Sequence, residues 1–214
     1  MKSTKKIVIL GICMTMLHGC ATSRGVIDVN EEVASNPAAG VDVKIVRVDD
    51  KRRFEIDPRQ ANIPSLKNDE IHDKAITSRA IARKRNSYGK ALGDILLPEG
   101  KTVMSLVEDS LTNGLRENGF RVLDEGDVGY DNAAPIEVDI EKFWGWFSPG
   151  FWKIGINFEI LLQIWGPIDP FVDGESFDSQ VKMTFMAAGE DNWIETIDAA
   201  LEALNRDIAE ELKQ

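Results

Sequence analysis

The chain of 214 residues is poor in two residue types from which many active sites are built, because it contains only two cysteines and two histidines. Cys13, His18 and Cys20 all lie near the N-terminus, in a segment that other features mark for processing. His72 is then the only histidine of the remaining chain, which has no cysteine available for chemistry. We therefore exclude a cysteine nucleophile, a thiol redox pair and a zinc site of Cys or several His from the body of the protein.

Catalytic motifs are lacking as well. The sequence has no glycine-rich phosphate loop and no GxSxG nucleophile elbow. A carboxylate pair could act on a glycan, but no spacing places two carboxylates across a cleft. The acidic segment 124–131 offers oxygen ligands suited to calcium, yet it matches no EF-hand loop and is typical of an acidic turn. We expect a protein that is not an enzyme and that has no cofactor and no metal.

Positive charge is in deficit. Lys and Arg number 25 against 36 Asp and Glu, which gives a formal net charge of -11. The three lysines among residues 1–19 fall in a stretch that we expect to be removed, which would bring the charge to -14. A surface this acidic disfavours nucleic acid and anionic headgroups as electrostatic partners.

No hydrophobic run at the N-terminus is long enough to span a membrane. The apolar stretch Ile7 to Leu17 has eleven residues, too few to cross about 30 Å of hydrocarbon. Because Lys2, Lys5 and Lys6 precede it, the stretch indicates a signal peptide over residues 1–19.

The sequence Leu17-His18-Gly19-Cys20 at the end of this segment resembles the bacterial lipobox, although a small residue is usual where His18 stands. The resemblance implies a lipoprotein whose membrane partner is reached through acyl chains on Cys20, where two or more chains anchor stably. Ala21 at the next position implies the outer membrane, with the body facing the periplasm. The alternative is an ordinary secretory signal that happens to contain Cys.

Two further segments follow the signal peptide. Residues 20–40 are mostly small and polar, which predicts a lipidated N-terminus and a flexible tether. The hydrophobic content of 43%, with five Trp and nine Phe, predicts that residues 41–214 form a single α+β domain.

The strongest structural signal is a period-two pattern from Trp152 to Ile164, which predicts a long strand with one dry face. Shorter alternations precede and follow it, and together they predict a three-strand meander. Apolar residues recur at helical spacing over 103–115 and 193–212. We therefore expect a mostly antiparallel twisted sheet with two amphipathic helices packed on one face.

Six aromatic residues gather in ten positions, from Phe143 to Trp152, around a Ser-Pro-Gly turn. Hairpin tips are usually polar, so these rings either fold back over the open end of the core or form an exposed contact for a partner protein, an apolar ligand or the membrane interface. The candidate contact residues are Trp144, Trp146, Phe147, Phe151 and Trp152.

A basic island interrupts the acidic chain between residues 79 and 90. It is either a solvated face that pairs with nearby acids or a recognition patch for an acidic partner or phosphate. Its members are Arg79, Arg83, Lys84, Arg85 and Lys90.

The helix, glycine, aromatic and strand unit over 103–122 is similar to the corresponding unit of the YajG-type family of bacterial lipoproteins, as are the lipobox and the stretch 83–89. This resemblance implies an envelope α+β lipoprotein without a catalytic residue. We expect a non-enzymatic binding or assembly module with an envelope protein as its partner. The alternative is a carrier that holds an apolar ligand between sheet and helices.

Overall fold

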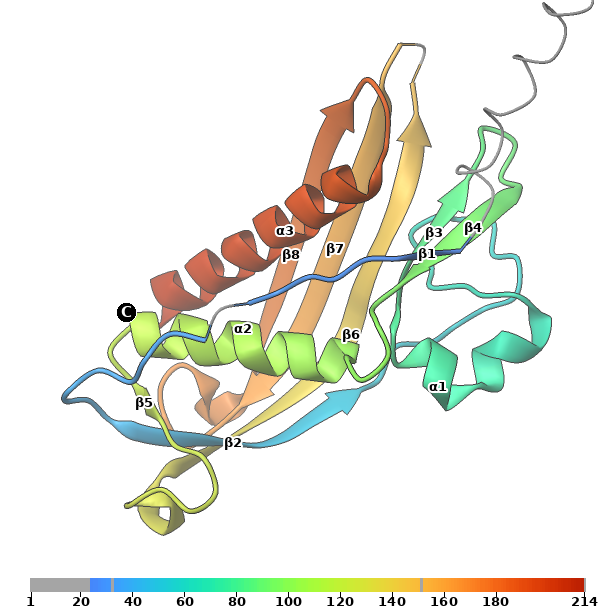
Figure 1. Cartoon of the computed structure of the whole chain (residues 1–214). Coiled ribbons are helices and arrows are strands. Elements are labelled where there is room, and N and C mark those ends of the chain that lie inside the picture. Colours follow the sequence, from blue (N-terminus) through green and yellow to red (C-terminus); the bar gives the residue numbers. More distant parts are fainter. Residues whose placement is uncertain (1–23, 32, 151, 214) are drawn as a thin grey trace, which may run out of the picture.

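The structure is a computed structural model that describes residues 24–31, 33–150 and 152–213. Its described strands form one sheet (Figure 1): β1 Gly25–Val26, β2 Asp42–Asp50, β3 Ala80–Arg85, β4 Ala91–Leu96, β5 Arg121–Val122, β6 Ala134–Pro149, β7 Ile154–Trp165 and β8 Glu175–Phe185. The described α-helices are α1 Lys74–Thr77, α2 Val103–Glu117 and α3 Glu190–Glu211. Short 3-10 turns lie at Asn68–His72, Tyr130–Asn132 and Phe171–Asp173.

The sheet is organised around β6, whose two edges have different neighbours. One edge pairs antiparallel with β7 along almost its whole length, and β8 follows on the far side of β7. The other edge is divided, because its first half pairs with β2 as far as Ile140 and its second half pairs with β3 at Gly145 and Trp146. The sheet therefore forks along β6 into one arm of β2 and β5 and another of β3, β4 and β1.

The prediction of a mostly antiparallel sheet with two helices on one face is wrong. The sheet is mixed, with four of its seven described strand pairings parallel, and the described residues form three α-helices. The antiparallel part includes the meander of β6, β7 and β8. The period of two residues per repeat is the same in both kinds of sheet, so the pattern could not reveal that β2 and β3 run parallel to β6.

The helix α2 begins and ends where its local sequence provides caps. Thr102 accepts a hydrogen bond from the Ser105 backbone at 3.1 Å, and Ser105 Oγ accepts one from the Thr102 backbone at 3.0 Å. At the other end, Gly119 has a φ of 87°, and the Phe120 N–H donates to the Leu115 carbonyl at 3.0 Å. This C-terminal turn, which the sequence predicts, leads the chain directly into β5.

The main core lies between the sheet and the helices α2 and α3 (Figure 1). The period-two pattern of β7 is confirmed, since Ile156, Phe158, Ile160, Leu162 and Ile164 are all fully buried. The strand begins at Ile154 and not at Trp152. Each such side chain contributes about 1.5–3 kcal/mol on burial, so this face holds the helices in place.

The described part of the predicted tether lies against the domain. Gly25–Val26 pairs with β4, and Ile27 and Val29 are buried in the main core. Further along, the Ala34 N–H donates to Asn113 of α2 at 2.7 Å. Two apolar residues of this mostly polar segment, Ile27 and Val29, are thus part of the core, and the described part of the segment runs along the domain across α2 (Figure 1).

Candidate functional site

A cavity with a volume of about 890 Å³ lies at the end of the sheet where the β6–β7 hairpin, the β8–α3 connection and the arm of β1, β3 and β4 meet. We call it the terminal cavity. Its walls are mainly apolar, and their principal side chains are Ile27, Leu92, Ile95, Phe147, Ile154 and Trp193.

Two stacked rings form one wall of the terminal cavity. The ring centroids of Phe147 and Trp193 lie 5.1 Å apart at an interplanar angle of 30°. Trp193 is placed by the first turn of α3, where Asn192 Oδ1 accepts the Gly189 N–H at 3.0 Å. Gly145 makes room for the indole, since a Cβ at that position would lie 2.7 Å from Trp193 Cζ3.

Charged residues line the same cavity and have both signs. Arg24 is already engaged, because it donates to Glu70 at 2.7 Å and to Asp94 at 3.0 Å. Glu190 and Asp191 contribute negative charge from the start of α3. This arrangement suits an apolar group whose polar end stays near the charged side chains.

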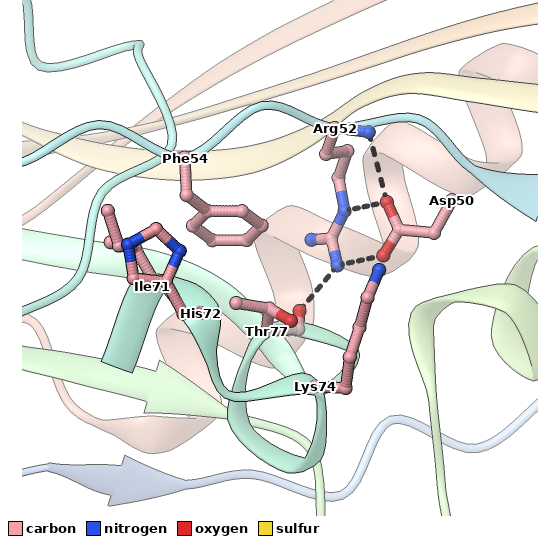
Figure 2. A pocket seen from close by; sticks show the side chains of 7 residues that line it. All are labelled: Asp50, Arg52, Phe54, Ile71, His72, Lys74 and Thr77. Atoms are coloured by element: carbon pink, nitrogen blue, oxygen red, sulfur yellow. Dashed lines mark hydrogen bonds and ion pairs between the residues drawn. The ribbon is translucent and has the colours of Figure 1, made fainter. Parts of the chain in front are cut away.

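A second, smaller cavity has a volume of about 250 Å³ and is shown in Figure 2. We call it the Arg52 cavity. It lies where the end of β2 meets α1 and the 3-10 turn that precedes α1. The lining residues are Asp50, Arg52, Phe54, Ile71, His72, Lys74 and Thr77.

All five N–H donors of the Arg52 guanidinium are used within the chain. Nε and Nη2 donate to the Asp50 carboxylate at 2.8 and 2.7 Å, and Nη2 also donates to the Thr77 carbonyl at 2.8 Å (Figure 2). Nη1 donates to the carbonyls of Ala80 at 2.6 Å and Phe143 at 3.2 Å. The buried guanidinium in the wall of this cavity is therefore satisfied without a ligand.

The position of Arg52 explains why the fork in the sheet is stable. Phe143 lies on β6 between Ile140, the last residue paired with β2, and Gly145, the first paired with β3. At this point none of the described strands covers the β6 edge that faces β2 and β3, and the guanidinium donates to the Phe143 carbonyl in place of a strand. Arg52 thus has a structural role, and the Arg52 cavity follows from it.

The predicted aromatic contact residues are divided between the two faces of the sheet. Trp144 is fully buried and meets Phe54 edge to face at 5.8 Å, in a second core cluster, and the half-buried Trp146 packs against the same cluster. Phe147 is on the opposite face and lines the terminal cavity. Trp152 is 77% exposed, whereas Phe151 lies outside the described residues.

The predicted basic island is not gathered on the surface. Arg83, Lys84 and Arg85 are buried in β3, which lies between β4 and β6. Arg83 Nη1 lies 3.4 Å from Asp94 Oδ1. Arg85 donates to the Gly89 carbonyl at 2.9 Å and to Ser65 Oγ at 3.0 Å.

Of the remaining basic residues, Arg79 donates to the Leu97 carbonyl at 2.9 Å, and Lys90 is exposed. Burial lowers the pKa of Arg85, and the neighbouring charge of Arg83 lowers it further. The proposed lipidation site, Cys20, lies outside the described residues.

Sequence reasoning missed the terminal cavity. Trp193 is predicted as a core residue of the last helix, and Leu92 lies in β4, a strand that has no clear alternation. The cavity is formed where β1, β4, the β6–β7 hairpin and the start of α3 come together. These segments are far apart in the sequence, so no local sequence pattern predicts their contact.

Two absences hold for the part of the chain that the structure describes. No three His, Cys, Asp or Glu side chains come together there as a metal site would require. Likewise, within residues 24–31, 33–150 and 152–213, no helix has both the length and the apolar character needed to cross a bilayer.

Comparison with known proteins shows the fold. No family model matches the chain, and no curated protein matches it. A solved structure described as an uncharacterized protein matches with a TM-score of 0.50 and 8% identity, over 89% of this chain and 99% of its own. Protein XCC0632 from Xanthomonas campestris, described with family-model DUF330, has a TM-score of 0.47 and 13% identity, over 86% of this chain and 91% of its own. At such identities, the likeness to the first protein shows a shared fold alone.

Proposed function

We propose that this protein is a non-enzymatic lipoprotein of the bacterial outer membrane, of the YajG type, and that its periplasmic domain is a binding module. The support for the anchor is the sequence Leu17-His18-Gly19-Cys20 after a short apolar run. Three acyl chains on Cys20 would hold the protein at a membrane surface, since each buried methylene contributes about 0.8 kcal/mol.

The terminal cavity is the binding site in this proposal, and its size and apolar walls are the observation that carries it. Ligand sites of proteins typically have volumes of roughly 300–1,000 Å³ and mainly hydrophobic linings. A volume of about 890 Å³ beside the Phe147–Trp193 stack falls within this range.

The ligand class that fits best is an acyl chain, because apolar contact is what most of the wall provides. The space between the sheet and the helices is filled by core side chains, so an apolar ligand of this protein would bind at the end of that layer. Binding would require no covalent step. Arg24 and Lys84 also line the cavity and would provide positive charge near the carboxylate end of such a ligand.

The anchor is tested by replacing the proposed lipidation site. In cells fed labelled palmitate, the wild-type protein should take up label and fractionate with membranes, and Cys20→Ser should do neither. Cys13→Ser is the matched control and should behave as wild type. Equal labelling of wild type and Cys20→Ser would contradict the proposed anchor.

The cavity is tested with a photoreactive fatty acid added to cells, followed by purification and mapping of the labelled peptides. Met186 lines the cavity and is 76% exposed, so Met186→Glu should place a charge in the binding site without disturbing the core. The control is Val172→Glu, which is 57% exposed and lies outside the cavity lining. Labelling should fall at least about tenfold in the first variant only. Equal labelling in both variants would contradict the site.

A partner protein at the hairpin tip is a second candidate function, favoured by the 77% exposure of Trp152. Trp152→Ser should then reduce crosslinking to an envelope protein without changing stability. Trp144 is unsuitable for this test, because it is fully buried and its replacement would damage the fold.

A further inference from the structure

The strand β8 ends the sheet on one side and has no second partner among the described strands. Its eleven residues pair with β7 from Glu175 opposite Ile164 to Phe185 opposite Ile154, without a register shift. Its sequence contains no proline and no glycine. Long, regular edge strands of this kind are open to pairing with another chain, and proteins usually interrupt them with bulges, prolines or several charges.

The exposed side chains of β8 have a pattern that is symmetric in charge about the centre of the strand. Gln180 is the middle residue of the eleven, with Asp178 two positions before it and Lys182 two positions after it. All three are exposed. Neither charged side chain forms an ion pair within the described part of the chain.

An antiparallel copy of β8 would turn this symmetry into complementarity. With Gln180 opposite Gln180 of the second copy, all eleven residues pair, and Asp178 of each copy lies opposite Lys182 of the other. Opposite charges in such cross-strand positions stabilise a sheet, whereas like charges destabilise it. Two-fold axes centred on Asp178 or on Lys182 instead would place two like charges opposite each other.

The other face of β8 favours the same register. Phe177, Val181, Met183 and Phe185 lie on the side that α3 covers, and the last three are only half-buried. In the symmetric pairing, Phe177 would lie opposite Met183 and Ser179 opposite Val181, and only at the two ends would Phe185 lie opposite Glu175. In the central part of the interface, apolar side chains would therefore meet apolar or small ones on the helix side of a continuous sheet.

We propose that the outer edge of β8 pairs with a second copy of this chain in an antiparallel, two-fold symmetric dimer centred on Gln180. Such a dimer has a closed, self-complementary interface, because each copy contributes the same strand. The pairing joins the two sheets through β8, and the two terminal cavities then lie at opposite ends of the assembly. This proposal is independent of the anchor and of any ligand.

The test uses full-length protein in which one cysteine is added to the native Cys13 and Cys20, at an exposed position of β8. Directly opposite residues have Cβ atoms roughly 4.5–5.5 Å apart, close to disulfide geometry, so Gln180→Cys should form a covalent dimer under mild oxidation. Ser176→Cys is the matched control, because its copies would lie about 27 Å apart along the strand. We expect at least about tenfold more covalent dimer with Gln180→Cys, after subtraction of the wild-type background.

Charge reversal provides a second measurement that leaves the strand intact. Asp178→Lys and Lys182→Asp should each weaken dimerisation about tenfold in analytical ultracentrifugation, because each places like charges opposite each other twice. The double variant should restore the wild-type affinity. A monomeric wild type, equal dimer yields from the two cysteine variants, or capture of another protein through Gln180→Cys would each overturn the proposal.

Discussion

The Arg52 cavity and the terminal cavity differ in whether the side chains that line them find partners within the fold. In the first, a buried guanidinium uses all five of its donors on the chain's own carboxylate and carbonyl groups. In the second, apolar side chains such as Leu92 and Ile154 are only half-buried, so part of their surface is exposed to solvent. A buried polar group requires partners within the fold, whereas an apolar wall can be covered later by a ligand. Of the two cavities, the terminal one is therefore the candidate site.

The largest expected effect is on stability, at Arg52 in the Arg52 cavity. Arg52→Met removes the partner of the Asp50 carboxylate, whose side chain is 16% exposed, and leaves three carbonyls without their donor. Breaking a buried ion pair in this way costs about 3–5 kcal/mol of unfolding free energy. Urea unfolding measures it, and Arg53→Met on the exposed neighbour is the control. Equal stability of the two variants would show that Arg52 does not hold the fork.

A smaller effect is expected at the aromatic wall of the terminal cavity. In Gly145→Ala the new methyl group would lie 2.7 Å from Trp193 Cζ3 and 2.8 Å from Phe158 Cδ2. Overpacking of this kind costs about 1–3 kcal/mol, so the midpoint of urea unfolding should fall. Gly25→Ala is the control, because no atom lies within 4 Å of the added Cβ. An unchanged midpoint in Gly145→Ala would mean that the wall is looser than the structure shows.

The smallest effect extends the comparison to a charge that is only partly compensated. Burial raises the pKa of the Glu31 carboxyl, a hydrogen bond from Asn113 opposes this shift, and nearby carboxylates, first that of Asp198, raise the pKa further. Because the folded-state pKa lies above the unfolded one, ionised Glu31 destabilises the fold at neutral pH. This penalty disappears as the pH falls through the folded-state pKa. Glu31→Gln should therefore stabilise the protein at pH 7, and the gain should vanish near pH 4.

Asp28 is the control with the opposite sign for this pH test. A hydrogen bond from Lys101 lowers the pKa of its carboxyl, so the ionised form stabilises the fold. Asp28→Asn should lose this stabilisation at pH 7, and the loss should diminish as the pH falls through the folded-state pKa. If the urea midpoints of both variants shifted in the same direction at pH 7, the inferred surroundings of Glu31 would be wrong.

The sequence predicted the elements whose pattern is local. The helices over 103–115 and 193–212 and the long strand before residue 165 follow from spacing alone, because each has one buried face. The strand β3 could not be recognised in this way, since all six of its residues are buried, and three of them are basic. A segment rich in charged residues is normally exposed to solvent, whereas the charged residues of β3 are covered by neighbouring segments.

The relations between distant segments could not be predicted either. The Arg52 guanidinium donates hydrogen bonds to four residues that span positions 50 to 143, and the terminal cavity is lined by residues from position 24 to position 193. Both depend on the parallel pairing of β2 and β3 with β6, for which the amino-acid pattern has no signature. Of the predicted candidate residues, Phe147 from the aromatic group and Lys84 and Arg85 from the basic island line the terminal cavity, but the sequence did not predict that they come together or which residues form its other walls.

The divided edge of β6 has a consequence for the order in which the molecule can assemble. β2 and β3 are complete by residue 85, but the strand that both need begins only at Ala134. A chain synthesised from its N-terminus must therefore keep one edge of β2 and one edge of β3 unpaired until some fifty more residues have been made. When β6 has been made, it can pair with both β2 and β3, and this single strand then joins both arms into one sheet.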